Sequence, residues 1–247
     1  MPPPPLAGRI ALVTGASRGI GYAAAFALAK AGAHVVAVAR TVGGLEELDD
    51  AVKGLGGSAT LVPLDLRDYD GIDRLGLALH ERFGRLDVLV GNAGMLGPLS
   101  PLGHVEAKAW HDVMAVNVTA NWRLICATDA LLKVSEAGRV VFVTSGITAQ
   151  APAYWGPYTV SKAALEALAR TYAAESATTR VRVNLFNPGP IRTRMRAQAM
   201  PGEDPTALET PDQAAEKIVD LCLPGMQENG KLYSYPLRRF LEFSPPR

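Results

Sequence analysis

The sequence predicts a single α/β domain with a doubly wound parallel sheet of about seven strands and helices on both faces. Short continuous apolar runs alternate with helical patterns along the 247 residues. Such runs are typical of parallel strands that are buried on both faces. No Ser/Gly linker or low-complexity spacer divides the chain, and α/β folds of this length are often single domains.

The apolar runs define the order of the elements. We expect strands at 9–14, 34–40, 58–64, 86–92, 139–145, 180–188 and 231–236. Helical patterns occupy 21–32, 45–55, 69–84, about 106–135, 156–170 and 210–223. Gly32 and Gly84 end two of these helices, and Thr210 caps the last one with Pro211 in its first turn. Right-handed crossovers then place the helices on both faces of the sheet.

Composition excludes several classes of function. Lys and Arg number 25 and Asp and Glu 24, so the formal net charge of +1 argues against nucleic-acid binding and polybasic membrane contact. No run of about 18 uncharged apolar residues predicts a membrane span. Residues 1–7, "MPPPPLA", predict a disordered lead-in to a domain at 8–247, and without a targeting signal we expect a cytoplasmic protein.

Cysteine and histidine contribute no expected site. Cys126 and Cys222 lie in apolar helical patterns and predict buried thiols. The four histidines lack metal-ligand spacing, so no metal is expected.

Ligands of doubly wound folds bind beyond the carboxyl ends of the strands. The first strand runs into "TGASRGIG", whose glycines allow a tight turn and whose following helix points free N–H groups at an anion. After a first strand and before a helix, this pattern favours dinucleotide phosphate binding over an ordinary turn. The loop comprises Thr14, Gly15, Ser17, Arg18, Gly19, Ile20 and Gly21.

The end of the second strand indicates which dinucleotide binds. NAD enzymes usually place an acid about 20 residues past the glycine motif, but this chain has Arg40 and Thr41 there. Arg40, with Arg18 from the loop, would attract a 2′-phosphate through charge-assisted hydrogen bonds. The alternative is that both arginines are solvated surface residues. We therefore expect NADP(H) to be preferred over NAD(H).

Further candidates follow the third to fifth strands. Asp65, before Leu66, is positioned to accept a hydrogen bond from an adenine amino group or to cap the next turn. Asn117 is a poor helix former in a helical pattern, and either holds the helix open around a water or is an ordinary solvated residue. Ser145 ends the fifth strand, where it either faces the expected cleft or is an ordinary helix or turn cap. The fourth strand ends in a segment suited to close passage of a ligand, Asn92, Ala93 and Gly94.

Tyr158 and Lys162 begin the helix "GPYTVSKAALEALAR". Four residues advance a helix by about one turn, so both side chains leave the same face. On a surface they would form an ordinary solvated pair, but in a cleft a phenol beside a positive charge would be a proton donor.

Together these motifs resemble the short-chain dehydrogenase/reductase family. "TGASRGIG", "GNAG", Asn117, Ser145, "YTVSK" and "NPGPIRT" occur in the family's order and approximate spacing over about residues 8–225. The resemblance implies a Rossmann-like fold and a homo-tetramer or homo-dimer with contacts through two long helices. It also places residues of the sixth strand's end around the cofactor: Pro188, Gly189, Ile191 and Thr193.

The resemblance also implies catalytic roles. Ser145 would hydrogen-bond the substrate oxygen, and Tyr158 would be the general acid in reduction and the base in oxidation. Lys162 would contact the nicotinamide ribose and lower the pKa of Tyr158, and Asn117 would hold a water in a proton relay to Lys162. The expected activity is NADPH-dependent interconversion of a small ketone or aldehyde and an alcohol.

Two alternatives remain open. One is reduction of a 3-oxoacyl group on an acyl carrier, which Arg192, Arg194 and Arg196 would favour by attracting an anionic substrate to an expected lid at about 190–211. Those arginines can equally form a solvated helical face. The tail "GKLYSYPLRRFLEFSPPR" lacks the glycine-rich turn of many family members and disfavours that reductase group. The second alternative is a nucleotide-bound sensor or scaffold without chemistry.

Overall fold

A single eight-stranded sheet forms the centre of the computed structural model, which describes residues 3–243. The strand order is β3-β2-β1-β4-β5-β6-β7-β8, and every neighbouring pair is parallel except β7 and β8. The order reverses between β1 and β4, as in Rossmann-like folds. The strands are β1 Ile10–Thr14, β2 His34–Ala39, β3 Ala59–Pro63, β4 Val88–Gly91, β5 Arg139–Val143, β6 Arg182–Asn187, β7 Leu232–Ser234 and β8 Arg239–Leu241.

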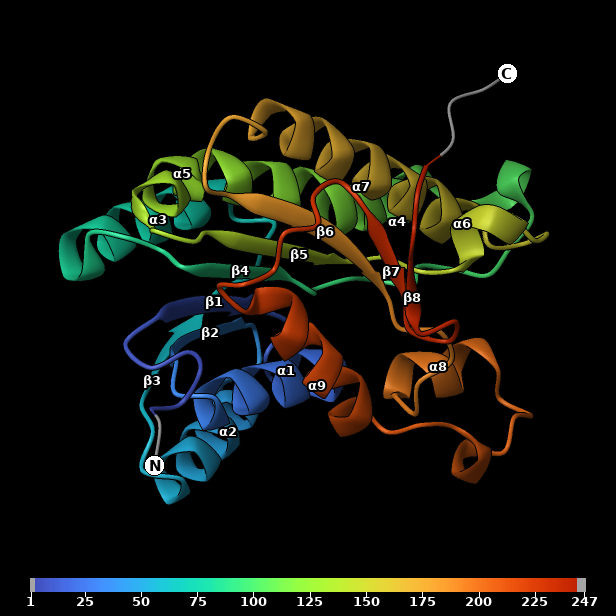
Figure 1. The fold of residues 1–247 in the computed structure, drawn as a ribbon. Coiled ribbons are helices and arrows are strands. Elements are labelled where there is room, and N and C mark those ends of the chain that lie inside the picture. The colour runs from blue at the N-terminus through green and yellow to red at the C-terminus, as the bar shows by residue number, and fades with distance from the viewer. Residues whose placement is uncertain (1–2, 244–247) are drawn as a thin grey trace.

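Helices cover both faces of this sheet (Figure 1). One face carries α1 Gly19–Lys30, α2 Val42–Gly54 and α9 Pro211–Cys222, and the other α3 Tyr69–Phe83, α5 Ala120–Val134 and α7 Gly156–Glu175. Shorter elements are η1 Leu102–His104, α4 Ala107–Met114, the π-helical segment η2 Ala115–Thr119, α6 Ile147–Gln150, α8 Arg194–Ala199 and η3 Pro205–Ala207. The predicted doubly wound α/β fold is confirmed.

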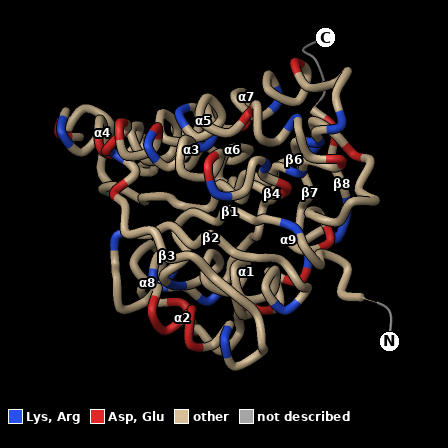
Figure 2. The backbone as a smooth tube through the Cα atoms, turned by 90° about the vertical axis from the view of Figure 1, so that its left-hand side faces the viewer, with Lys and Arg blue, Asp and Glu red and all other residues tan. Residues whose placement is uncertain are grey.

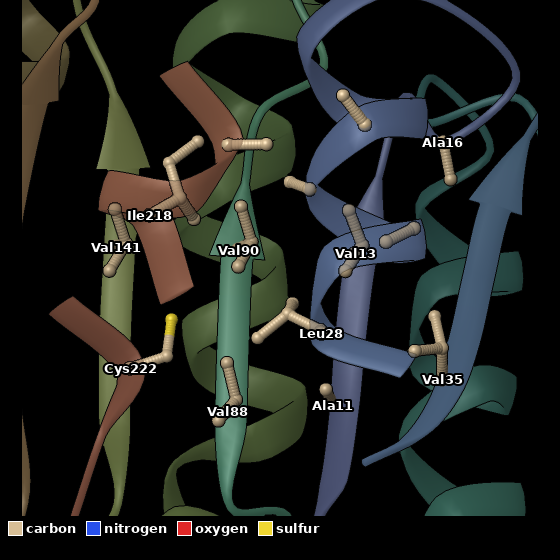
Figure 3. Packing of buried hydrophobic residues seen from close by; sticks show 14 of the residues in the cluster. Ala11, Val13, Ala16, Leu28, Val35, Val88, Val90, Val141, Ile218 and Cys222 are labelled. Atoms are coloured by element: carbon tan, nitrogen blue, oxygen red, sulfur yellow. The ribbon is translucent and has the colours of Figure 1, made fainter. Parts of the chain in front are cut away.

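Successive strand residues face two separate apolar layers because side chains alternate across a strand. Val13 of β1 packs in the layer that contains Leu28 of α1 and Ile218 of α9 (Figure 3). Its neighbour Leu12 belongs to the opposite layer, with Leu124 of α5. Burial of every β1 side chain explains the continuous apolar run in the sequence.

The predicted helix ends are formed by local hydrogen bonds. The Thr210 hydroxyl accepts from the backbone N–H of Gln213, whose side chain accepts in turn from the Thr210 N–H, and Pro211 starts α9. Gly84 ends α3 with a φ of 66°, a left-handed conformation that suits glycine.

The lead-in differs from the expected disorder where the structure describes it. Leu6 is fully buried in the α1–α9 layer, and its N–H donates to the carbonyl of Ala31. One apolar side chain therefore ties residues 3–7 to the end of α1, while residues 1–2 lie outside the described part.

The tail adds a strand that the sequence did not predict. β8 turns back on β7 in an antiparallel pair, and Phe240 contacts the edge of Tyr233 at 5.2 Å between ring centroids. The predicted strand at 231–236 is confirmed over 232–234. Residues 244–247 lie outside the described part.

The expectation for the cysteines is correct for one of the two. Cys222 is fully buried beside Ile218 (Figure 3), whereas Cys126 is exposed on α5. The helical pattern around Cys126 did not distinguish the inner from the outer face of α5.

Charges of both signs are interspersed along the chain (Figure 2). Acidic residues gather on α2, and many exposed charges form ion pairs, such as Lys53 with Asp49 at 2.6 Å. Within residues 3–243, no helix has both the length and the apolar character needed to cross a membrane.

Candidate active site

A cavity of about 1000 Å³ lies at the carboxyl ends of the parallel strands. Its wall includes Gly15, Ser17, Arg18, Gly19, Ile20, Arg40, Thr41, Asp65, Leu66, Asn92, Ala93, Gly94, Ser145, Tyr158, Lys162, Pro188, Gly189, Ile191 and Thr193. Three predicted residues, Thr14, Gly21 and Asn117, are buried behind the wall. The structure thus brings together residues that are almost 180 positions apart in the sequence.

Two glycines of the loop, Gly15 and Gly21, are packed too closely for a side chain. A Cβ on Gly21 would lie 2.2 Å from the carbonyl oxygen of Gly15, which itself has a φ of +68°. The first turn of α1 has no acidic residue and no side-chain cap. Its N–H groups are therefore available to an anion in the cavity, as a dinucleotide pyrophosphate requires.

Thr14 links the ends of β1 and β4 from behind the wall. Its hydroxyl accepts hydrogen bonds from the backbone N–H groups of Asn92 and Ala93, at 3.0 and 3.1 Å, and donates to the carbonyl of Val90. The Asn92 amide donates to the Thr14 carbonyl at 2.9 Å. These bonds hold the two strand ends in one arrangement.

Arg40 stands at the cavity with its side chain half exposed, 3.8 Å from Asp65. Asp65 pairs more closely with Arg67, at 2.7 Å, and this partner holds the pKa of Asp65 at about 2. Asp65 also accepts from the backbone N–H of Arg67, so its predicted turn-capping role is seen. Arg18 has no carboxylate partner within residues 3–243.

Tyr158 and Lys162 leave the first turns of α7 toward the cavity. The Lys162 Nζ donates to the carbonyl of Val143 at 2.7 Å and lies 5.8 Å from the centroid of the Tyr158 ring. Ser145, just beyond β5, reaches the same space. The two segments therefore converge on one end of the cavity.

Burial perturbs both titrating groups. Burial raises the pKa of Tyr158, and a hydrogen bond with Ser145 acts in the opposite direction. Burial lowers the pKa of Lys162 to about 8, and the charge of Glu166 acts against this shift. The pKa of Tyr158 is therefore raised, not lowered by Lys162 as the resemblance implied, because burial outweighs the one hydrogen bond. The protein's own groups keep Tyr158 protonated, as a proton donor requires.

Asn117 lies within the π-helical segment η2 and is fully buried. Its amide oxygen accepts from the N–H of Met95 at 2.7 Å, and its Nδ2 donates to the Met95 carbonyl and to Ser161 Oγ, both at 2.9 Å. A Cβ on Gly94 would lie 3.4 Å from Asn117 Oδ1 and 3.6 Å from Lys162 Nζ. The helix is locally widened at Asn117, which joins the end of β4 to α7.

Two polar residues that join neighbouring segments of the site were missed by the sequence interpretation. Asn187 accepts from the backbone N–H groups of Gly146 and Gly189, at 2.9 and 3.0 Å, and so ties the ends of β5 and β6 together. Glu166 accepts from two threonines beside Ser145. The sequence contained a signal for each. Asn187 is a polar residue at the end of a predicted strand, and Glu166 follows Lys162 by four residues, which places it on the same helix face.

The segment expected as a lid, about 190–211, contributes several residues to the cavity wall. Arg196 forms two bonds of 2.6 Å to Glu203, whereas Arg192 and Arg194 are exposed at the cavity without a carboxylate partner in the described chain. Several apolar side chains also line the cavity: Met95, Leu96, Leu99, Trp155 and Met195. Tyr154, in contrast, does not line the cavity and is 60% exposed.

The strand order and this cavity define the class of protein as a Rossmann-like oxidoreductase, in which a glycine loop and a Tyr–Lys pair face one another. The comparisons then specify the family. Residues 9–204 match the family model described as short chain dehydrogenase. The chain therefore belongs to the short chain dehydrogenase family, as its motifs predicted, and enzymes of this family use a nicotinamide cofactor.

Three similar proteins illustrate the range of relatives. The uncharacterized oxidoreductase YciK of Escherichia coli is 40% identical over 206 residues, covering 82% of this chain and 81% of its own. An uncharacterized NAD-dependent oxidoreductase of Mycobacterium tuberculosis is 34% identical, with 89% and 91% covered. A structure of a short chain dehydrogenase from Shigella flexneri complexed with NADP superposes with a TM-score of 0.90, at 35% identity over 94% of this chain and 99% of that one.

Proposed function

We propose that the chain is an NADPH-preferring oxidoreductase that interconverts a ketone or aldehyde and the corresponding alcohol. The observation that carries this proposal is the convergence of Ser145, Tyr158 and Lys162 on one end of the cavity. A module that only binds a nucleotide needs no buried proton donor there.

The residues around the cavity fit a dinucleotide. Crowding at Gly21 and the uncapped start of α1 suit a pyrophosphate. Arg18 and Arg40 would hold a 2′-phosphate, and no acid occupies the end of β2, where NAD enzymes usually have one. The NADP complex of the Shigella protein supports this preference, whereas the name of the mycobacterial relative points to NAD.

Each catalytic side chain has one task in the proposed reduction. When bound, the nicotinamide supplies the hydride. Ser145 holds the substrate oxygen and stabilises the charge that develops on it, while Tyr158 donates its proton to that oxygen. The phenolate left on Tyr158 is stabilised by the charge of Lys162 and regains a proton through Lys162 and a water held at Asn117.

The direct test measures cofactor consumption across a panel of ketones, aldehydes and alcohols, with NADPH and NADH compared. We expect turnover with at least one carbonyl substrate and a higher kcat/KM for NADPH. Nucleotide binding without turnover on any member would instead support the sensor or scaffold. Equal or better use of NADH would overturn the cofactor preference.

A second candidate, reduction of a 3-oxoacyl group on an acyl carrier, rests on Arg192 and Arg194. Both line the cavity beside apolar side chains and have no carboxylate partner in the described chain. A carrier phosphate would engage them by charge. The panel should therefore include a 3-oxoacyl thioester with its phosphorylated carrier arm and a truncated thioester without it.

We also propose a homo-dimer or homo-tetramer that associates through α5 and α7. Trp122 of α5 is 47% exposed and Val160 of α7 is 41% exposed, so each helix offers apolar surface to a second copy. Light scattering after size-exclusion chromatography tests the assembly, and a Trp122→Glu variant that stays oligomeric would argue against this surface.

A further inference from the structure

Glu166 is a buried carboxylate close to the proposed catalytic residues. It follows Lys162 by four residues on α7, so Tyr158, Lys162 and Glu166 lie along one face of the helix. Its side chain is largely removed from solvent. A buried carboxylate costs several kcal/mol unless hydrogen bonds or charges compensate it. Its partners therefore indicate why it is there.

Two hydroxyls from the segment around Ser145 point at one oxygen of Glu166. The Thr144 Oγ1 donates to Glu166 Oε1 at 2.8 Å, and the Thr148 Oγ1 lies 3.0 Å from the same oxygen. Thr148 Oγ1 is also 3.2 Å from the carbonyl of Ser145. Glu166 thus connects α7 to residues on both sides of Ser145.

The charge of Glu166 acts on Lys162. The charged groups that act on Glu166 are Lys162 and Arg170, both on α7. Thr144, just after β5, and Thr148 of α6 contact it through hydroxyls. Burial raises the pKa of Glu166, and the two threonines act against this shift by stabilising the carboxylate. Glu166 is the charged group that offsets the desolvation of Lys162.

We propose that Glu166 is a positioning residue that holds the Ser145 segment against the helix carrying Tyr158 and Lys162 and supplies the counter-charge for Lys162. A neutral hydrogen-bond acceptor would be enough to hold the two segments together. The carboxylate adds a negative charge one turn from Lys162, which keeps the ammonium protonated in a buried site. The inference rests on the proposed function for its catalytic consequence, but both physical parts can be measured without turnover.

Two substitutions of Glu166 separate its positioning role from its role as the counter-charge of Lys162. Glu166→Gln keeps an oxygen that accepts from the threonines and removes the charge, whereas Glu166→Leu removes both. We expect the Gln variant to keep kcat within about fivefold and the Leu variant to lose about 30-fold or more, because a displaced Ser145 no longer meets the substrate oxygen. Both should keep the Kd for NADPH within about threefold, so the loss falls on kcat.

The pair Thr144→Val with Thr148→Val provides a second test should the Leu variant fail to fold. It leaves Glu166 in place, removes both donors, and should lower kcat by a similar factor. The matched control is Glu175→Gln, an exposed acid on the same helix, which should leave kcat unchanged. Wild-type kcat in both the Leu variant and the valine pair would overturn the positioning role.

Two readouts are independent of turnover. The Lys162 side-chain NMR signal, assigned by its loss in Lys162→Met, should titrate about half to one pH unit lower in Glu166→Gln than in wild type, because a stabilising anion is gone. Amide hydrogen exchange at 144–150 should accelerate in Glu166→Leu and in the valine pair, and not in Glu166→Gln. If the titration midpoint of Lys162 is the same in Glu166→Gln as in wild type, Glu166 is not its counter-charge. These results remain decisive even if no carbonyl substrate is turned over, which would contradict only the proposed function.

Discussion

Buried charges lie at both ends of the parallel strands, in very different surroundings. At the amino ends, Asp87 accepts from the backbone N–H of Ile10 at 2.9 Å and from Ser135 Oγ at 2.6 Å, with Arg9 and Arg85 beside it. Every direction around this carboxylate offers a donor. At the carboxyl ends, Lys162 is as deeply buried but donates to a single carbonyl, and its other directions face the cavity.

Arg139 strengthens the comparison. This arginine at the amino end of β5 is buried, and burial lowers its pKa to about 10, yet it donates to the carbonyls of Gly138, Arg180, Leu223 and Pro224. Removing a partner from a fully paired buried charge destabilises the fold, whereas a buried charge with missing partners is held for a ligand or a reaction. The following predictions test this distinction, from the largest expected effect to the smallest.

The largest effect is expected from Tyr158→Phe. Removing the proton donor should lower kcat for carbonyl reduction by about 1000-fold while the Kd for NADPH stays within about twofold. Tyr172→Phe is the matched control, because Tyr172 is a buried tyrosine on the same helix whose hydroxyl donates to Asp129 at 2.9 Å. Steady-state kinetics and cofactor titration provide the measurements, and substantial remaining turnover would remove Tyr158 from its role.

At the amino ends, Asp87→Ala should lower the free energy of unfolding by about 3 kcal/mol. The Ile10 N–H and the Ser135 hydroxyl lose their acceptor, and Arg9 and Arg85 each lose their carboxylate partner. Turnover per folded molecule should not change. Urea denaturation measures the loss, and Asp50→Ala, an exposed acid on α2, should stay within about 0.5 kcal/mol of wild type. A loss below about 1 kcal/mol would contradict the structural role.

Lys162→Met should raise the free energy of unfolding, the opposite of the effect of Asp87→Ala. The pKa of Lys162 falls from 10.5 to about 8 on folding, which costs about 3 kcal/mol at pH 7. After about 1 kcal/mol for the lost hydrogen bond to Val143, the cofactor-free variant should be about 2 kcal/mol more stable at pH 7 and inactive.

The pH dependence of this gain gives a sharper test. Between pH 8 and 10.5 the unfolded wild-type chain binds the additional proton at Lys162, so wild-type stability rises with pH across that window. The advantage of Lys162→Met should therefore shrink as pH rises from 8 toward 10. Denaturation at several pH values checks this, and a variant that is less stable at pH 7 would show that Lys162 is adequately compensated.

The smallest effect is expected from the exposed cation Arg40. Arg40→Ala should weaken NADPH binding by about 10-fold or more and leave NADH within about twofold, because only NADPH carries the 2′-phosphate. Arg74→Ala, an exposed arginine on α3 paired with Asp68, is the control. Equal weakening of both nucleotides would place Arg40 on a part of the cofactor that they share.

Local patterns in the chain determined the class of fold and most of the cavity wall. Strands buried on both faces need continuous apolar runs, and a tight turn before a helix needs residues such as Gly15 and Gly21, so both left a signal over a few neighbouring positions. Tyr158 and Lys162 share a helix face, which spacing alone predicts.

Only the tertiary structure decided which side chains complete that wall from a distance. The contact of Glu166 with Thr144, the bond of Asn187 to Gly146, and the burial of Leu6 join segments that are far apart in sequence. The exposure of Cys126 and the strand β8 likewise depend on what packs beside them. Long-range contacts of this kind follow from packing and desolvation across the whole fold, so a local pattern contains no sign of them.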